Sequence, residues 1–261
     1  GEWRGGDVET AGALAGAAIE AATALALRGE VDGVVTAPID KAALAAAGYR
    51  FPGHTEMLQS LAGAEDVVML MAAERTSLGG ALRVVLATTH LALRDVPAAV
   101  TTDRLVRQAR LTARGLRERW GMDVPRLALC ALNPHASDHG LFGDEEERVL
   151  EPAVAALREE GVDITGPLPA DTVFVRALRG EFDVVVAPYH DVGMAAFKTA
   201  SFGSGVNVTL GLPFVRTSPD HGTGYNIAGK NQANESSMRE AIYQAGEIFR
   251  HRSEHSKEKK V

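Results

Sequence analysis

Three histidines stand at corresponding places in this chain, each at the carboxyl end of an apolar run: His90, His135 and His190. The last run, 182–188, is rich in valine, which is typical of a strand buried on both faces of a parallel sheet. Because chemistry in such sheets collects at the carboxyl ends of strands, we expect the three side chains at one edge. Imidazole binds zinc, cobalt, nickel and iron, so the pattern allows a shared metal site. Three unrelated histidines bonded to nearby backbone would give the same spacing.

A second group consists of Lys198, Asn207 and Arg216, which lie near the ends of expected strands in a stretch rich in glycine and threonine. Two cations and an amide make a reasonable cradle for a phosphate or a carboxylate. His54 and Thr55 stand at an expected helix start, where backbone N–H groups favour anions. Solvated side chains and simple helix caps are the alternatives for these positions.

Nucleotide binding has a weaker signature in the sequence. The chain has no Gly-x-x-x-x-Gly-Lys-Ser/Thr loop, and the glycines at 203–205 precede an expected strand instead of joining a strand to a helix. The loop 221–229 is rich in glycine and polar residues, and it could wrap a nucleotide through backbone contacts or be an ordinary connection. The candidates for cofactor contact in this loop are Gly222, Thr223, Asn226 and Gly229.

Strands and helices alternate along the chain, which is typical of an α/β fold with a largely parallel sheet. Capping residues and hydrophobic patterning predict helices over 7–28, 41–47, 57–61, 101–120, 144–160, 173–178 and 234–249. They predict strands over 31–36, 66–72, 83–90, 127–135, 163–166, 182–191, 206–210 and 214–217. The charged segment 251–261 is expected to be a disordered tail.

Composition narrows the classes of protein that remain. A length of 261 residues suits one large α/β domain or two small ones, and a net charge of −7 argues against a nucleic-acid surface. Cys130 is the only cysteine, so no disulfide framework or cysteine zinc site is available, in keeping with a reducing compartment. We find no apolar run of membrane-spanning length and no signal peptide, and we expect a cytoplasmic protein without membrane contact.

Several runs, taken in order, resemble the 4-hydroxythreonine-4-phosphate dehydrogenase family of vitamin B6 biosynthesis. The resemblance extends over about 31–229 and rests on the runs 36–41, 51–56, 87–91, 132–136, 166–172, 189–191, 205–213 and 216–222. It implies a fold like that of isocitrate and isopropylmalate dehydrogenases, with two α/β/α subdomains, largely parallel sheets and a cleft between them. We expect residues 1–52 with 203–261 to form the first subdomain and 53–202 the second. It further implies a homodimer with its site at the interface.

The resemblance also implies roles for the residues singled out above. A divalent metal, zinc with magnesium or cobalt as alternatives, would be held by His90, His135 and His190, with one of the three donated across the dimer. In one arrangement His190 completes a site whose other two ligands come from the partner chain. The phosphorylated substrate would be held at His54, Thr55, Lys198, Asn207 and Arg216, and NAD would accept the hydride. Asp171, Asp191 and Lys198 are the catalytic candidates, the two carboxylates for orientation or proton transfer.

The sequence departs from the family pattern in places that bear on substrate identity. The family's opening strand and its Gly-Asp-Pro-Ala-Gly-Ile-Gly-Pro-Glu motif have no counterpart, so we expect the first subdomain to be incomplete at its amino end. Val192 stands where the family has glutamine. The expected reaction is oxidation of 4-phosphohydroxy-L-threonine, with erythronate or threonate 4-phosphate and, less favoured, a cyclic dihydrodiol carboxylate as alternatives. A metal- or phosphate-binding protein without turnover is the alternative of another class.

Overall fold

One mixed sheet of eight strands runs through the computed structural model, which describes residues 7–258. The strands, in chain order, are β1 (Gly33–Val35), β2 (Val68–Ala73), β3 (Leu82–Leu86), β4 (Leu127–Cys130), β5 (Ile164–Leu168), β6 (Val184–Ala187), β7 (Val206–Leu210) and β8 (Val215–Pro219). Their spatial order is β1-β8-β7-β2-β3-β6-β4-β5. The pairs β1–β8, β3–β6, β6–β4 and β4–β5 are parallel, whereas β8–β7, β7–β2 and β2–β3 are antiparallel.

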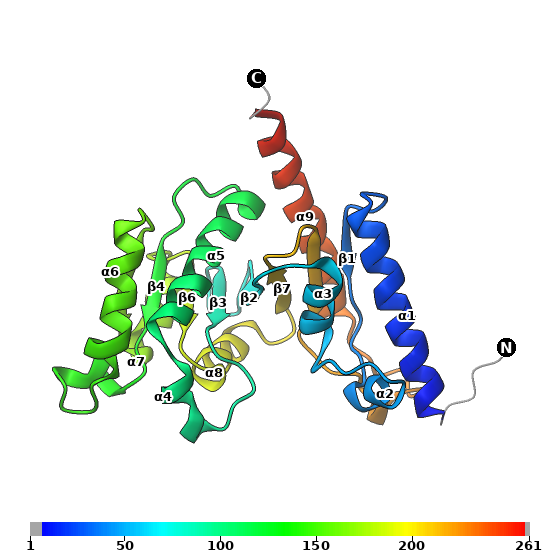
Figure 1. Cartoon of the computed structure of the whole chain (residues 1–261), viewed down its shortest axis with the longest axis horizontal. Coiled ribbons are helices and arrows are strands. Elements are labelled where there is room, and N and C mark those ends of the chain that lie inside the picture. The colour runs from blue at the N-terminus through cyan, green and yellow to red at the C-terminus, as the bar shows by residue number, and fades with distance from the viewer. Residues whose placement is uncertain (1–6, 259–261) are drawn as a thin grey trace.

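Helices cover both faces of this sheet (Figure 1). They are α1 (Val8–Leu27), α2 (Lys41–Ala46), α3 (His54–Ala62), α4 (Val96–Ala99), α5 (Thr102–Trp120), α6 (Glu151–Glu159), α7 (Ala170–Leu178), α8 (His190–Ser201) and α9 (Ser236–Glu258). Short turns of 3₁₀ helix occupy Leu93–Asp95, Pro134–Asp138 and Tyr225–Ile227, and a π turn occupies Glu146–Leu150. The alternation of strands and helices matches the expectation from the sequence.

Local sequence explains where several helices begin and end. The side chains of Asp7, Asp40 and Thr101 accept hydrogen bonds from backbone N–H groups of the first turns of α1, α2 and α5, which is what N-cap residues do. The helix α5 ends at Gly121, which adopts φ 65° at the C-cap, a conformation that glycine takes without steric cost. These elements therefore match their predicted ranges closely.

Alternation of side chains along the strands divides the core between the two faces. On one face, side chains of β2, β3, β4, β6 and β7 pack against α5, α6 and α9, and this cluster includes Leu70, Val85, Val186 and Val208. On the other face Met71, Val84, Val185 and their neighbours pack against α7 and α8. A third cluster joins α1 and α3 to Val34 and Phe214 at the β1 end of the sheet. The strands and helices that carry the candidate site residues are thereby fixed from both sides.

Several expectations for secondary structure are wrong. The strands expected over 83–90 and 127–135 end at Leu86 and Cys130, before their histidines, and the helix expected over 57–61 begins at His54. The run that ends at His190 is strand only over β6, and His190 itself begins α8, a helix that the sequence patterning did not predict. The N-cap residue Tyr189 makes no side-chain cap, so no capping signal marks this start. The tail expected to be disordered from 251 onward continues α9 as helix to Glu258, while 259–261 lie outside the described residues. No glycine or proline interrupts this stretch, and its glutamates and lysines favour helix.

The subdomain division stays a proposal, and the sheet order bears on it. The segments expected in the first unit contribute β1, β8 and β7, which are neighbours at one end of the sheet, and 53–202 contributes the five strands that follow. Helix α3, expected in the second unit, packs against α1 and the residues Val34 and Phe214. Residues 1–6 and 259–261, which were expected to belong to the first unit, lie outside the described residues.

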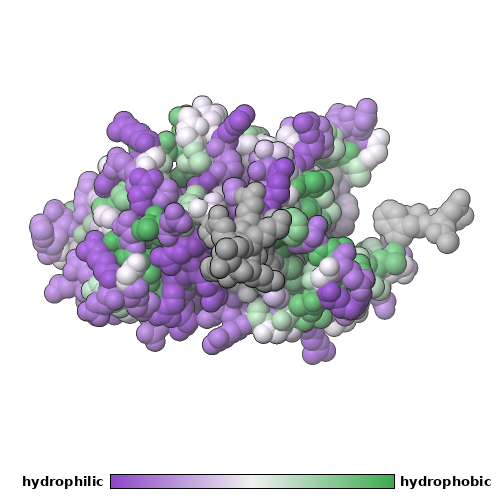
Figure 2. All heavy atoms as spheres, turned by 90° about the horizontal axis from the view of Figure 1, so that it is seen from above, coloured by the Kyte–Doolittle hydropathy of each residue, from purple (hydrophilic) through white to green (hydrophobic). Residues whose placement is uncertain are grey.

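Helix α1 corrects a statement made from the sequence. By length and composition it is apolar enough to cross a membrane, with a mean hydropathy of 1.5, whereas we expected no such run. The cause is its alanine content, since alanine counts as apolar while burying little surface. Helix α1 packs closely on α2 through small residues. A Cβ added at Gly12 would overlap the Ala43 carbonyl oxygen of α2. Hydrophobic side chains elsewhere on the visible face lie in patches between hydrophilic ones (Figure 2).

Candidate active site

The rings of His90 and His190 are neighbours, with centroids 5.7 Å apart. They follow β3 and β6, which are adjacent and parallel, so both reach the carboxyl edge of the sheet. Two bonds hold these strand ends together beyond the ladder: Ala87 N–H donates to the Ala187 carbonyl at 2.9 Å, and Thr88 Oγ1 donates to the Pro188 carbonyl at 2.8 Å. The predicted meeting of strand-end histidines is thus present for this pair.

Both rings of the pair are suited to bind a metal. Burial, followed by the charges of Lys41 and His190, lowers the pKa of His90 against an opposing effect of Glu56, which favours the neutral imidazole that ligation requires. The Nδ1 atom of His190 lies 2.6 Å from Oδ1 of Asp191. In a neutral ring this contact places the proton on Nδ1 and leaves Nε2 available, the usual arrangement around carboxylate-oriented metal ligands.

The third histidine lies apart from this pair within one chain. His135 follows β4, in a turn where it adopts φ 53°, and its ring contacts Phe142 with centroids 6.4 Å apart. No group of three or more histidine, cysteine, aspartate or glutamate side chains close enough to hold a metal occurs among the described residues. Burial, with a contribution from Glu146, raises the pKa of Cys130 to about 12, so this nearby thiol stays protonated at neutral pH. Among the described residues, His135 makes no ring contact with His90 or His190.

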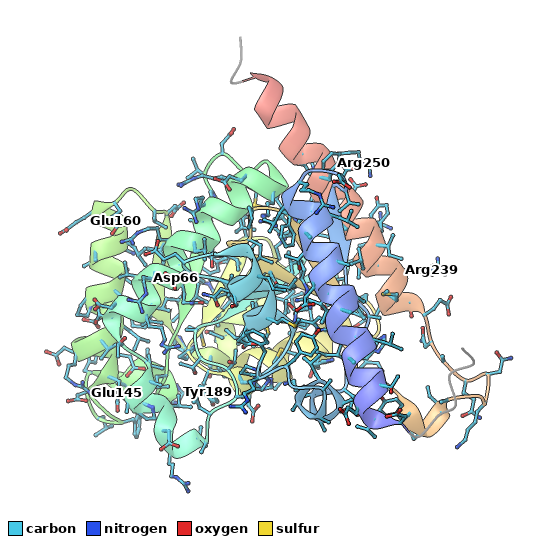
Figure 3. The ribbon with its side chains drawn as sticks, turned by 45° about the vertical axis from the view of Figure 1, so that its right-hand side comes forward. Asp66, Glu145, Glu160, Tyr189, Arg239 and Arg250 are labelled. Atoms are coloured by element: carbon cyan, nitrogen blue, oxygen red, sulfur yellow. The ribbon has the colours of Figure 1, made fainter. Side chains whose placement is uncertain are left out.

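In Figure 3, Glu145 and Tyr189 lie at the same end of the molecule, and Glu160 lies at the opposite end. Asp171 lies in the first turn of α7, after β5, which is parallel to β4. Its side chain is exposed. The edge thus carries all three histidines and both candidate carboxylates, although it brings only His90, His190 and Asp191 into direct contact.

Arg216 of β8 is the most deeply buried charged residue of the candidate site, with 2% of its surface exposed. Nη1 donates to Thr209 Oγ1 at 2.9 Å and Nη2 donates to Thr36 Oγ1 at 2.8 Å, and Nε has no partner. Burial lowers the pKa of this guanidinium to about 10, although the charge of Glu56 opposes the effect. A buried cation that bonds to hydroxyls and forms no ion pair with any carboxylate among residues 7–251 is prepared for an anion.

Three further residues predicted to hold the substrate lie on α3 and β7. His54, the first residue of α3, is largely buried, and this burial together with Arg216 lowers its pKa to about 4. Asn207 lies two residues before Thr209 on β7, hence on the same face of the sheet as Arg216, and its buried Oδ1 has no hydrogen-bond partner. Thr55 follows His54 in the first turn of α3. His54 and Asn207 thus lie on the Arg216 side of the site, whereas the role of these residues in holding a substrate stays a prediction.

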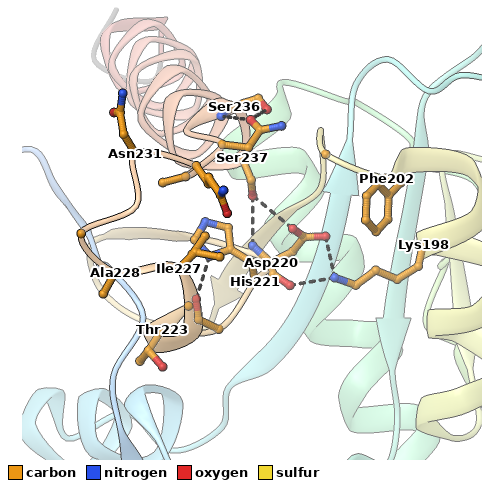
Figure 4. Close-up of a pocket in the computed structure, with 17 residues that line it drawn as sticks. Lys198, Phe202, Asp220, His221, Thr223, Ile227, Ala228, Asn231, Ser236 and Ser237 are labelled. Atoms are coloured by element: carbon orange, nitrogen blue, oxygen red, sulfur yellow. Dashed lines mark hydrogen bonds and ion pairs between the residues drawn. The ribbon is translucent and has the colours of Figure 1, made fainter.

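Lys198 is committed to a different contact. Its Nζ donates to Oδ2 of Asp220 at 2.9 Å and to the Asp220 carbonyl at 2.7 Å. The carboxylate of Asp220 is itself 6% exposed and accepts from Ser237 Oγ at 3.1 Å. Figure 4 shows this chain of contacts at the wall of a cavity of about 690 Å³. The third N–H of the ammonium remains available, so Lys198 can donate a hydrogen bond to a ligand in the cavity from a fixed position.

The glycine-rich loop proposed for the cofactor lines the same cavity. Gly222, Thr223 and Gly229 contribute to its wall, whereas Asn226 does not. Phe202 lines the cavity and is 89% exposed, which offers an apolar face to a planar ring. The cavity is therefore lined by the glycine-rich loop, by the Lys198–Asp220 pair and by an aromatic ring, a combination of apolar and polar groups that is common in ligand sites.

Several residues of the site escaped the sequence analysis. Thr36 and Thr209 hold Arg216, Asp220 holds Lys198, and Lys41 and Glu56 act on His90 through their charges. The period-two spacing of Asn207 and Thr209 in a strand was a usable signal, since both must share a face. The other contacts join segments far apart in the chain, and no local pattern marks them.

Comparison with known proteins decides the family. The family model described as pyridoxal phosphate biosynthetic protein PdxA matches residues 4–245. The chain belongs to the PdxA family. It is 52% identical over 233 residues to a 4-hydroxythreonine-4-phosphate dehydrogenase of Geobacter metallireducens, covering 89% of this chain and 67% of that protein. The resemblance drawn from the sequence runs is thereby confirmed.

Solved structures agree with this membership of the PdxA family. The crystal structure of a 4-hydroxythreonine-4-phosphate dehydrogenase from Klebsiella pneumoniae matches with a TM-score of 0.86 and 44% identity, covering 95% of this chain and 74% of that one. An isocitrate dehydrogenase from Methylococcus capsulatus matches with a TM-score of 0.52 at 14% identity over 94% of this chain and 83% of that one, a likeness of fold alone. The expected fold class is confirmed. The chain spans 67% and 65% of the length of two curated relatives.

Proposed function

We propose that this protein is a 4-hydroxythreonine-4-phosphate dehydrogenase that oxidises 4-phosphohydroxy-L-threonine to its 3-keto acid, which loses carbon dioxide to give 3-amino-2-oxopropyl phosphate. The observation that carries the proposal is the buried guanidinium of Arg216, which has hydroxyl partners and no ion pair in the part of the chain that the structure describes. A phosphorylated substrate supplies the missing anion. Membership of the PdxA family and the names of the relatives support the same reaction.

The phosphate end of the substrate is bound by groups that do not take part in bond breaking. Arg216 supplies the charge, and Asn207 and the amino end of α3, with His54 and Thr55, supply polar contacts. The low pKa of His54 keeps its ring neutral at pH 7, so it contributes a hydrogen bond and no further charge. This end of the site fixes the position of the reacting carbon at the histidine edge.

The residues present fit a divalent metal, zinc with magnesium or cobalt as alternatives. His90 and His190 of one chain would hold it, and His135 of a second chain would complete the set, because His135 does not join the pair within a chain. This assignment replaces the arrangement in which His190 meets two histidines of the partner. When bound, the metal polarises the substrate hydroxyl and lowers its pKa. The homodimer is thus part of the proposal.

Two carboxylates divide the remaining tasks. Asp191 contacts His190 Nδ1 and orients that ring, while Asp171, exposed at the same edge, accepts the hydroxyl proton. Bound NAD would supply the acceptor for the hydride from the carbon that bears the hydroxyl. The resulting keto acid loses its carboxylate as carbon dioxide, and the carbon that carried this group takes up a proton. The loop 221–229, with Gly222, Thr223 and Gly229 at its cavity wall, would bind this cofactor beside Lys198, and Asn226 remains a proposed contact from the same loop.

The same site bears on the alternative substrates. Erythronate or threonate 4-phosphate would use the Arg216 end equally well, and Val192 in α8 is the position that leaves this choice open. A cyclic dihydrodiol carboxylate is disfavoured because it lacks the phosphate that Arg216 and Asn207 suit. A cytoplasmic location and the absence of nucleic-acid and membrane partners stay predictions from the sequence.

Initial rates of NADH formation test the proposal. The chain is assayed with NAD and zinc on 4-phosphohydroxy-L-threonine and, separately, on erythronate 4-phosphate. We expect turnover of the first with the larger kcat/KM. Preference for the second compound would move the function to the alternative substrate, and zinc and phosphate binding without NADH from either would leave a binding protein.

A further inference from the structure

Glu146 is a buried carboxylate to which the proposed reaction assigns no role. It is 1% exposed, and its Oε1 accepts from the backbone N–H groups of Leu132 at 2.9 Å and Asn133 at 2.7 Å. Its Oε2 accepts from Nδ2 of Asn133 at 2.9 Å. No ion pair to a lysine or arginine involves it in the part of the chain that the structure describes. Burying a charge at this depth costs free energy, because the group loses its hydration, and the three hydrogen bonds offset part of that cost.

The backbone around Glu146 is unusual and aims this side chain. Glu146–Leu150 forms a π turn, a feature found often at functional sites. Pro152 follows in the first turn of α6 and lacks the N–H that would bond to the Arg148 carbonyl, so the regular helical ladder is interrupted here. The π turn directs Glu146 under the end of β4, where Leu132 and Asn133 would otherwise leave two buried N–H groups unpaired.

The segment that Glu146 holds is strained. Residues 135–139, none of them glycine, all have positive φ angles between 44° and 63°. Left-handed conformations are sterically unfavourable for residues with a Cβ, and they persist only where surrounding contacts fix them. At the far end the Phe142 N–H donates to the Ser137 carbonyl at 3.0 Å. At the near end the fixing contacts are those from Asn133 to Glu146, two residues before His135.

We propose that Glu146 is a positioning residue of the reaction site, which holds the Asn133 turn so that the left-handed run presents His135 to the metal. The inference rests on the proposed function, in which His135 is the ligand given to the second chain. Glu146 is too deeply buried to touch substrate or metal, and it acts through Asn133. A carboxylate serves here because all three of its partners are N–H donors.

The substitution Glu146→Gln removes the negative charge of the side chain and keeps its shape. In Glu146→Gln one oxygen still accepts from the two backbone N–H groups, but the new amide nitrogen faces Nδ2 of Asn133, donor against donor. Asn133 would retain only its 2.7 Å contact with Oε2 of Glu145. The matched control is Glu147→Gln, which removes the same charge from the next residue, an exposed one with no side-chain hydrogen bond in the described part of the chain.

The experiment measures zinc affinity of the metal-free full chain by competition with a chromophoric chelator, and the visible spectrum of the cobalt form. We expect Glu146→Gln to weaken zinc binding about 10- to 100-fold, as loss of a metal site's supporting contacts does, and to alter the cobalt spectrum. Glu147→Gln should stay within about twofold of the parent protein, since it leaves those supporting contacts in place. Stabilisation by inorganic phosphate, which reports the Arg216 end, should be equal in all three.

The outcomes separate the two levels of the argument. A folded Glu146→Gln protein with parental zinc affinity overturns the positioning role and leaves the proposed function intact. A parent protein that binds neither zinc nor cobalt overturns the metal part of the proposed function and the positioning role with it. Should Glu146→Gln fail to fold, Asn133→Ala decides, because it removes only the side-chain link: weaker zinc binding supports the role and unchanged binding refutes it.

Discussion

Arg216 on β8 donates a 2.8 Å hydrogen bond from Nη2 to Oγ1 of Thr36, which follows β1 and lies 180 residues earlier in the chain. Together with Thr209 on β7, this contact fixes a buried guanidinium across three neighbouring strands. Burying this cation lowers the free energy of unfolding but increases the affinity of the site for an anion, and both effects can be measured.

Replacing Arg216 should separate stability from binding. In Arg216→Met the buried charge is gone, so we expect a free energy of unfolding equal to or above that of the parent. Inorganic phosphate at about 100 times its Kd should stabilise the parent by about 2.7 kcal/mol and the variant by nothing measurable. Thermal unfolding with and without phosphate measures both quantities. Arg110→Met, at an exposed ion pair with Glu160, is the control and should keep the full phosphate effect; its loss there would show that phosphate binds elsewhere.

His54 predicts how stability depends on pH. Its pKa is about 4 in the folded chain and about 6.5 unfolded, so the unfolded state binds the proton more tightly. The contribution of the neutral ring is complete above pH 6.5 and is lost as the pH falls from 6.5 towards 4. After allowance for the part of the ring that remains exposed, we expect a loss of about 2 kcal/mol.

Urea unfolding at several pH values between about 7.5 and 4.5 measures this loss, with His54→Gln as the variant that should flatten the curve by that amount. His139→Gln, at an exposed loop histidine, serves as the control and should leave the curve unchanged. An identical slope for the parent and His54→Gln would contradict the assignment.

Gly193 allows α8 to approach the sheet. A Cβ at this position would lie 2.6 Å from Cδ2 of Leu86 and 3.0 Å from Cβ of Ala187, so Gly193→Ala must move the helix that begins at His190. We expect destabilisation of about 1–3 kcal/mol and weaker zinc binding. Gly246→Ala in α9, where nothing lies within 4 Å of the added Cβ, should stabilise by about 0.5–1 kcal/mol. Calorimetry of both variants gives the answer, and an undisturbed Gly193→Ala protein would show that the packing is loose.

Asp220 should affect both the stability of the fold and the affinity of the cavity for NAD, because it fixes Lys198. Asp220→Asn removes the charge that fixes Lys198 and weakens the bond from Ser237, and we expect a loss of about 1–3 kcal/mol of stability. Freed from this contact, Lys198 should hold NAD less well, so KM for NAD rises while phosphate stabilisation is unchanged. Steady-state kinetics with varied NAD checks this; a rise in substrate KM alone would place Lys198 at the phosphate end.

The sequence predicts most elements whose signals are local. Asp40 indicates the start of α2 because caps act over a few residues, and the amphipathic pattern over 101–120 indicates α5. Helix α8 escapes prediction since Tyr189 offers no cap and Val192 and Gly193 weaken the helical pattern. The left-handed turn at His135 is also invisible in the sequence, because no glycine marks it.

The candidate site divides in the same way. The grouping of His54, Asn207 and Arg216 is predictable, since strand ends and helix starts indicate where side chains gather. Their supporting partners depend on sheet order, which places β1 beside β8 and β3 beside β6 across long stretches of chain. Local patterning carries no information on such pairings, so Thr36 and Asp220 emerge only from the fold.

The most direct test is NADH formation from 4-phosphohydroxy-L-threonine by the chain before chelation, after chelation, and after zinc is restored. The account predicts turnover that chelation abolishes and zinc recovers, and no recovery in His190→Ala. Turnover that is indifferent to the chelator would contradict the role given to the three histidines, and no NADH under any condition would contradict the proposed reaction.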